Sequence, residues 1–268
     1  MSSKKLQMDQ PFKVLIDIYG VITSWDFVNV LDLYLKDNMI EFLDRYWDRH
    51  QITDFVNRLK DRTVVDRQSK PELPPIVDFD GQNKSDAIQS VIDNIYWREK
   101  HKLKTFSEDI LEFYNSIWTE GYNTKKLIVH VFDDVEPAFE KWTSEDLGIK
   151  IYTFASGPPK NQMLFLSSTV VGDLNKYVIN GIQAFNNYKY DSNKFKQIVS
   201  ALLERHPKNI LYLTDSPKKA RASIEAGLKA IVVLRPANKN YSKVMQDFTK
   251  HLTIAQNKVE NLTQVYIS

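Results

Sequence analysis

The feature that sets the architecture is an apolar run that ends in an acid and a glycine, Phe12-Lys13-Val14-Leu15-Ile16-Asp17-Ile18-Tyr19-Gly20. Its first half is rich in β-prone side chains, which predicts a buried strand. Gly20 predicts a turn directly after the strand. Because ligands of open parallel sheets bind beyond the carboxyl ends of the strands, Asp17 becomes the first candidate site residue.

Outward from this run, short apolar segments alternate with amphipathic ones. Residues 149–154, 210–214 and 230–234 predict further strands. Helices are predicted at 137–142, 159–166, 194–204 and 217–226. Such alternation is typical of an α/β fold with a parallel sheet and helices on both faces.

A long helical block interrupts this alternation after the first strand. Helical periodicity covers residues 25–52 and returns at 85–120, and the polar, proline-containing segment 61–84 predicts a surface loop between them. We therefore predict a core made of residues 1–24 and 121–268, with residues 25–120 inserted as a helical cap.

Composition excludes several classes of protein. The 268 residues include no cysteine, which rules out a disulfide scaffold, a thiolate nucleophile and a Cys-ligated zinc site. Lys and Arg total 36 against 34 Asp and Glu, so the charge gives no general attraction to nucleic acid or to an anionic membrane. We expect no secretory signal, because no apolar run follows the lysines of MSSKKLQMDQ. No apolar stretch approaches the ~20 residues of a membrane helix. We expect a protein of the cytoplasm or nucleus.

Three polar signals follow separate predicted strands: Asp17, Ser156-Gly157 and Asp215. Two carboxylates at one sheet edge are oxygen ligands for a hard dication, and one of them is a nucleophile toward phosphorus. A serine hydroxyl and the backbone N–H groups after it suit phosphate oxygens. Lys189 is the candidate cation that neutralises the nucleophile and a phosphoryl group.

These residues resemble the haloacid dehalogenase-like (HAD) superfamily. Its four motifs match, in order, Asp17-Ile18-Tyr19-Gly20, Ser156-Gly157, Lys189 and Thr214-Asp215. More narrowly, the chain resembles the enolase-phosphatase (acireductone synthase) family of methionine salvage. The nucleophile loop of that family reads approximately L-L-D-I-E-G-T-T-T-P-I-x-F-V, and residues 15–28 keep much of it. Further matches are Asp93-Asn94, Trp97, Trp118, Asp134-Val135, Pro137-Ala138, Gln162 and Arg235-Pro236.

The resemblance implies a Rossmann-like core with a helical cap, a Mg²⁺ cofactor and a small phosphorylated metabolite, 2,3-diketo-5-methylthiopentyl-1-phosphate, as substrate. It implies that Asp17 is the nucleophile, which forms an aspartyl-phosphate. The metal ligands would be Asp17, the backbone carbonyl of Tyr19 and Asp215. Ser156 and Gly157 would hold the phosphate, and Lys189 would complete the catalytic set.

The chain departs from the family pattern at positions that carry chemistry. The family has Glu, its general acid and base, where this chain has Tyr19, and a phenol with a pKa of about 10 is a poor base near neutrality. The family has a second Glu where this chain has Lys219. We expect Lys219 to approach Asp215, four residues earlier, and to weaken metal binding. Pro158 removes one backbone donor from the phosphate loop, and only Trp118 remains of the cap signature.

Three functions follow from this pattern. The first is a magnesium-dependent enolase-phosphatase whose activity is weak or lost. The second, from another class, is a catalytically degenerate member that serves as a binding or interaction protein, with a protein partner. The third is dehalogenation, because haloacid dehalogenases carry D-x-Y-G where this chain has Asp17, Tyr19 and Gly20. None of the three involves nucleic acid or a membrane.

Overall fold

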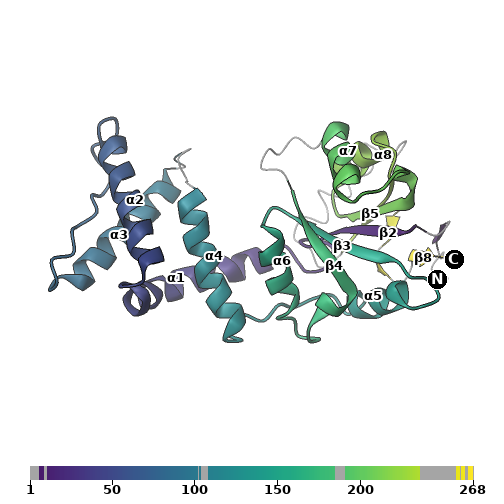
Figure 1. The fold of residues 1–268 in the computed structure, drawn as a ribbon, viewed down its shortest axis with the longest axis horizontal. Coiled ribbons are helices and arrows are strands. Elements are labelled where there is room, and N and C mark those ends of the chain that lie inside the picture. The colour runs from purple at the N-terminus through teal and green to yellow at the C-terminus, as the bar shows by residue number, and fades with distance from the viewer. Residues whose placement is uncertain are drawn as a thin grey trace. The chain divides into compact units, whose positions relative to one another are not determined.

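The computed structural model describes residues 6–8, 11–101, 103, 108–184, 191–235, 258–259, 261–262 and 265–267. The chain divides into two compact units, residues 1–29 with 128–268 and residues 30–127. The first unit is built on a parallel sheet and the second is helical (Figure 1). The limits 25–120 for a cap stay a prediction.

The sheet of the first unit confirms the predicted α/β class. Its strand order is β4-β3-β2-β5-β6-β7, and every neighbouring pair is parallel. The strands are β2 (Lys13–Asp17), β3 (Lys150–Ala155), β4 (Val178–Gln183), β5 (Ile210–Thr214), β6 (Lys229–Val233) and β7 (Lys258–Val259). Since Asp17 pairs with Phe154 and Ile16 with Leu213, the carboxyl ends of β2, β3 and β5 meet at one sheet edge. A separate parallel pair joins β1 (Leu6–Met8) and β8 (Val265–Ile267).

Helices cover both faces of this sheet (Figure 1). On one face, α7 (Ser192–Ala201) and α8 (Pro217–Glu225) bury an apolar cluster that includes Leu15, Phe195 and Tyr212. On the other face, α5 (Val135–Thr143) packs against β3. The helix α6 (Pro159–Leu166) packs against β4. Because the central strands are buried on both faces, they appear in the sequence as continuous apolar runs.

The helical unit contains most of α1 (Phe27–Tyr46), with α2 (His50–Arg67), α3 (Lys84–Lys100) and α4 (Glu108–Asn123). Apolar side chains from all four helices form its core, including Met39, Leu59, Ile95 and Ile117. The loop expected at 61–84 is wrong for its first residues, because α2 continues to Arg67. Thr63 explains the extension, since it is buried and its hydroxyl donates to the carbonyl of Leu59 within the helix.

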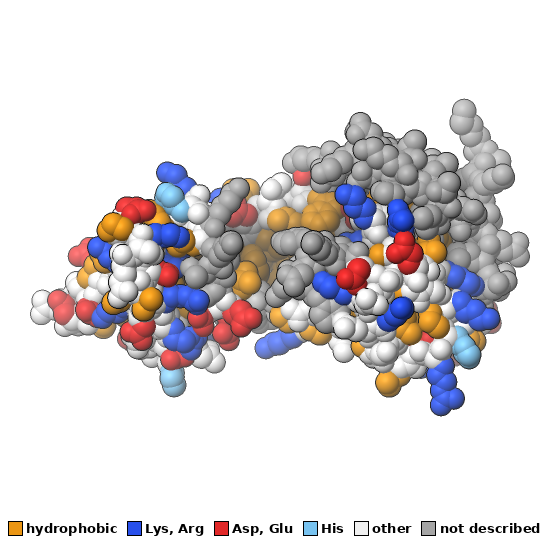
Figure 2. All heavy atoms as spheres, turned by 90° about the horizontal axis from the view of Figure 1, so that it is seen from above, with side chains coloured by type: hydrophobic (Ala, Val, Ile, Leu, Met, Phe, Trp, Pro, Cys, Tyr) orange, Lys and Arg blue, Asp and Glu red, His pale blue; other side chains and the backbone are white. Residues whose placement is uncertain are grey.

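The surface of this unit is highly charged and mixed in sign. Acidic and basic side chains lie interspersed over its visible face in Figure 2. Three ion pairs join residues four apart on helices: Lys36–Asp32, Arg45–Glu41 and Arg58–Asp54. Such pairs support helices modestly and favour solubility. In the part of the chain that the structure describes, no helix is both long and apolar enough to cross a bilayer.

A buried polar network joins α2 and α3. The side chain of Arg98 is fully buried and donates to Asp66 Oδ2 at 2.5 Å and to Asn94 Oδ1 at 2.7 Å. Thr63 Oγ1 accepts hydrogen bonds from both Arg98 and Asn94. Asn94 also donates to the carbonyl of Pro74, which ties the 68–83 loop to α3. Removal of one member would leave buried polar groups unpaired.

We predict that Arg98→Met lowers the free energy of unfolding by about 2–3 kcal/mol, because it leaves Asp66 and Asn94 without their charged partner. Denaturant unfolding followed by circular dichroism measures the change. The matched control is Arg62→Met on the exposed face of α2, which should change stability by less than about 0.5 kcal/mol. Equal effects of the two substitutions would contradict a structural role for the network.

Candidate functional site

Asp17 is the centre of the candidate site, and protein donors bind both oxygens of its carboxylate. The side chain is 2 % exposed at the carboxyl end of β2. The hydroxyl of Tyr212 donates to Oδ1 at 2.8 Å, and that of Thr214 donates to Oδ2 at 2.6 Å. Tyr212 and Thr214 are two residues apart on β5, so both side chains point to the same face of the sheet. This face is the one on which Asp17 lies.

Lys219 supplies the charge that compensates Asp17. Its Nζ lies 2.9 Å from Asp17 Oδ2 and forms an ion pair that is largely buried. The helix α8 places it there, since Ser216 is the N-cap and its hydroxyl accepts from the backbone N–H of Lys219. We expected Lys219 to approach Asp215. Its charge does lower the pKa of Asp215, but its ion pair is with Asp17.

Asp215 follows β5 and is also buried, at 7 % exposure. Burial first, and then the charge of Asp17, raise its pKa from 3.8 to about 6. The indole of Trp25 opposes this shift by donating from Nε1 to Asp215 Oδ2 at 2.6 Å. Thus Asp17 and Asp215 lie close enough to interact electrostatically, as the shared sheet edge predicts.

At position 19 the site has the aromatic ring of tyrosine, where the family pattern has a carboxylate. The ring stacks on Trp25 with a centroid separation of 5.6 Å and meets the edge of Phe165 at 6.0 Å. Burial raises the pKa of the Tyr19 phenol to about 12. The phenol therefore stays protonated near neutrality and accepts no proton there.

Gly20 lets the loop after Asp17 turn back against the second carboxylate. Its φ is +84°, which favours glycine, and its N–H donates to the carbonyl of Thr23 at 2.7 Å. A Cβ at this position would lie 2.2 Å from Asp215 Oδ2 and 2.6 Å from Trp25 Nε1. The loop is thus packed against Asp215 with less than the space of a methyl group between them.

A buried ion pair between Arg235 and Asp134 holds the same loop in place. The guanidinium makes two hydrogen bonds to Asp134, at 2.9 and 2.8 Å, and both side chains are buried. It also donates to the carbonyl of Val21 at 2.8 Å. Both residues belong to the family pattern found in the sequence, and their contacts hold the loop that follows Asp17.

The predicted phosphate loop follows β3, the neighbour of β2 in the sheet. Ser156 is exposed and Gly157 is half-buried, so both are accessible to a ligand. Gln162 is buried and fixes this loop, because its Nε2 donates to the carbonyls of Gly157 and Ile182. The remaining candidate, Lys189, lies outside the described residues.

The arrangement does not fit a divalent cation. Among the residues described, no third His, Cys, Asp or Glu side chain joins Asp17 and Asp215 in a metal-binding group, so only two side chains would hold the ion. Both oxygens of Asp17 and Oδ2 of Asp215 already accept hydrogen bonds from the protein. A cation beside Lys219 would also meet repulsion of about 4 kcal/mol per unit of charge at 4 Å and an effective dielectric constant of 20.

Two residues of this site, Trp25 and Tyr212, were not identified from the sequence. Trp25 was assigned to the start of the helical block, although the family pattern has isoleucine there. Tyr212 was assigned to a strand as an apolar residue. The sequence does carry a signal at position 25, because an indole has a polar N–H group that the aliphatic side chain of the family pattern lacks. Tyr212 could be found only from the register between β2 and β5.

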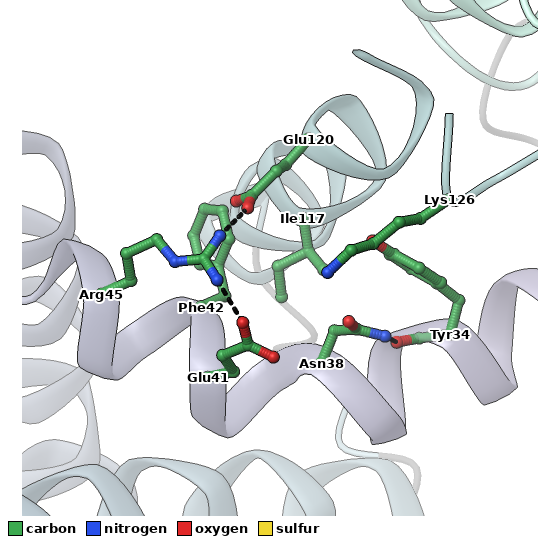
Figure 3. A pocket seen from close by; sticks show the side chains of 8 residues that line it. All are labelled: Tyr34, Asn38, Glu41, Phe42, Arg45, Ile117, Glu120 and Lys126. Carbon is green, nitrogen blue, oxygen red and sulfur yellow. Dashed lines mark hydrogen bonds and ion pairs between the residues drawn. The ribbon is translucent and has the colours of Figure 1, made fainter. Parts of the chain in front are cut away.

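The helical unit has a shallow hollow of its own, shown in Figure 3. Its lining residues are Tyr34, Asn38, Glu41, Phe42, Arg45, Ile117, Glu120 and Lys126. The guanidinium of Arg45 lies across it and donates to Glu41 and, at 2.6 Å, to Glu120. These pairs do not include Lys126, and Glu120 Oε2 is buried without a hydrogen-bond partner. None of the predicted site residues that the structure describes lines this hollow.

Comparison with known proteins relates the chain to enolase-phosphatases. No protein-family profile matches it. It is 30 % identical to Enolase-phosphatase E1 of Xenopus tropicalis over 226 residues, covering 84 % of this chain and 85 % of the relative. It is 32 % identical to Enolase-phosphatase E1 of Drosophila pseudoobscura pseudoobscura over 227 residues, with the same coverage of both chains.

Among solved structures, the Unknown transcript 4 protein of Saccharomyces cerevisiae is similar with a TM-score of 0.66. The match covers 95 % of this chain and all of the yeast chain, at 16 % sequence identity. At that identity the likeness establishes the fold alone.

The raised pKa of Asp215 predicts a pH dependence of stability. In the unfolded chain this carboxyl binds its proton with a pKa near 3.8, and in the folded protein with a pKa of about 6. The folded state therefore binds more protons between these values, and stability falls as the pH rises from about 4 to above 6. Asp215→Asn should remove this loss, which is on the order of 3 kcal/mol.

The measurement is the free energy of unfolding across pH 4–8 for the wild type and Asp215→Asn. Asp133→Asn, at an exposed position, is the control and should keep the wild-type curve. A wild-type curve parallel to that of Asp215→Asn would show that Asp215 titrates at an ordinary pH.

Proposed function

This chain belongs to the enolase-phosphatase E1 family, and we propose that it binds a small phosphorylated metabolite without hydrolysing it rapidly. The family supplies the ligand class, and the diketone phosphate that the sequence resemblance implies is the first compound to test. The accessible Ser156 and Gly157 at the end of β3 suit a phosphate group. Slow turnover follows from the groups around Asp17.

The observation that carries this proposal is Tyr19. Hydrolysis through an aspartyl-phosphate needs a proton for the leaving oxygen and then a base for the attacking water. The family places a carboxyl two residues after the nucleophile for both tasks. Here burial raises the pKa of the Tyr19 phenol to about 12, and its ring packs against Trp25 and Phe165. The protonated phenol is a weak acid for the first half-reaction and cannot serve as the base for the second near neutrality.

The nucleophile itself is also restrained. Attack on phosphorus requires a carboxylate oxygen of Asp17 to form a new P–O bond while the ester oxygen leaves. Oδ2 is bound by Thr214 and Lys219, and Oδ1 by Tyr212. Oδ2 carries two of these hydrogen bonds and Oδ1 carries one. Attack through Oδ2 would therefore displace donors in a buried site, which raises the barrier to the first step.

A second candidate function is a slow phosphohydrolase of the same family. The observation in its favour is that Asp17 and Asp215 remain close, because the charge of Asp17 contributes to the raised pKa of Asp215. Turnover that depends on Asp17 would support it.

We predict that Tyr19→Glu raises the rate of phosphate release from para-nitrophenyl phosphate by about 10-fold or more, since a placed general acid/base contributes ~10²–10⁴-fold. The wild type should release phosphate at the same low background as Asp17→Asn, and adding Asp17→Asn should abolish the gain of Tyr19→Glu. Steady-state phosphate release in the presence of Mg²⁺ is the measurement.

Tyr19→Phe is the matched control, because it keeps the ring and removes the hydroxyl. It should leave the slow wild-type rate unchanged. Rapid hydrolysis by both wild type and Tyr19→Phe would overturn the proposal, because the missing carboxyl would then be dispensable.

A further inference from the structure

We propose that the ammonium group of Lys219 is a built-in replacement for the divalent cation, so that this site holds its ligand without a metal. The inference deepens the proposed function and rests on it for the phosphorylated ligand. The claim about the cation itself concerns only Asp17, Asp215 and Lys219, and is tested separately from turnover.

The ammonium group of Lys219 lies next to the carboxylate of Asp17. Lys219 Nζ lies 2.9 Å from Asp17 Oδ2, which is the carboxylate that would bind a metal in the family. Asp17 is buried, and a buried carboxylate needs a cation or several donors beside it. The ammonium meets that need from within the chain, so Asp17 has no unpaired charge for a metal ion to neutralise.

The second carboxylate, that of Asp215, already has a hydrogen-bond donor and a packed loop beside it. Asp215 Oδ2 accepts the indole N–H of Trp25 at 2.6 Å. The backbone of Gly20 packs closely against the same oxygen, because a Cβ atom added to this glycine would lie 2.2 Å from it. A donor and a packed loop therefore occupy the surroundings of Asp215 Oδ2 on the side of the loop that follows Asp17.

The two departures from the family pattern at Tyr19 and Lys219 both change the charge of the site. The family pattern has Glu at the positions of Tyr19 and Lys219. Replacing the first by a neutral phenol adds one unit of positive charge, and replacing the second by an ammonium adds two. The three added units are comparable with the two that a Mg²⁺ ion would carry. The two departures thus compensate together for the loss of a metal.

Lys219 differs from its neighbour Lys218 in its burial and in its contact with Asp17. Lys218 has the same charge but lies exposed on the outer side of α8, whereas Lys219 is half-buried and reaches Asp17. The cluster of basic residues at the start of α8 therefore contains one lysine directed at the site. A substitution at Lys218 reproduces the change in net charge without touching Asp17.

The experiment measures metal binding directly, without turnover. Mn²⁺ binding is followed by electron paramagnetic resonance, and the melting temperature is recorded in EDTA and in millimolar Mg²⁺. The wild type should show no saturable Mn²⁺ binding that depends on Asp17. Lys219→Glu should bind Mn²⁺ at least ~100-fold more tightly than wild type, because it removes a cation and adds a ligand. Lys218→Glu should behave as wild type.

Lys219→Met provides a second readout that does not require a new ligand. This variant leaves Asp17 buried without its counter-ion, so it should melt at a lower temperature than wild type in EDTA. Mg²⁺ should restore part of the loss, because a ligand that binds only the folded state stabilises it. The wild-type melting temperature should not respond to Mg²⁺.

Saturable Mn²⁺ binding by the wild type that is lost in Asp17→Asn would overturn this inference, even if phosphate release were slow. Failure of both Lys219→Glu and Lys219→Met to gain a metal response would overturn it as well. Rapid hydrolysis by a metal-free wild type would instead overturn the proposed function and leave the role of Lys219 standing.

Discussion

The ion pair between Lys219 and Asp17 is the interaction on which the site depends. A carboxylate at the end of a central strand is removed from water, and its charge is tolerated only with compensation. The ammonium and two hydroxyls provide it from β5 and α8. The charge of Asp17 raises the pKa of Asp215, and the indole of Trp25 opposes that effect by donating to Asp215 Oδ2.

The aromatic residues of the loop follow from the same constraint. A site built around a metal needs oxygen ligands and water, which aromatic rings exclude. Here Tyr19 and Trp25 stack on each other, and Phe165 packs against the edge of Tyr19. This packing is compatible with carboxylates whose partners are already supplied by the chain. The rings and the ammonium therefore form one consistent arrangement, in which each departure from the family pattern makes the others tolerable.

Sequence reasoning reached the central strands and the two acids, because both leave strong local signals. Strands such as β5 are buried on both faces and appear as unbroken apolar runs. The edge strand β4 was missed, since Asn180 and Gly181 interrupt it and exposed side chains break its pattern. The partner of Lys219 was predicted from helical spacing to Asp215. Lys219 does lie near enough to Asp215 for its charge to lower the pKa of that carboxyl. Its ion pair is with Asp17, since Asp215 precedes the N-cap, Ser216, and lies outside α8.

What sequence could not supply is the set of contacts that cross the fold. Tyr212 and Lys219 are about 200 positions from Asp17, and only the register of β2 against β5 brings them to its carboxylate. The same contacts determine what Asp17 can do. An aspartate in a metal site is paired with a dication, whereas Asp17 is paired with an ammonium and two hydroxyls, with two donors on Oδ2 and one on Oδ1. The family resemblance proposes Asp17 as the nucleophile, and its neighbours in space fix its carboxylate at the end of β2.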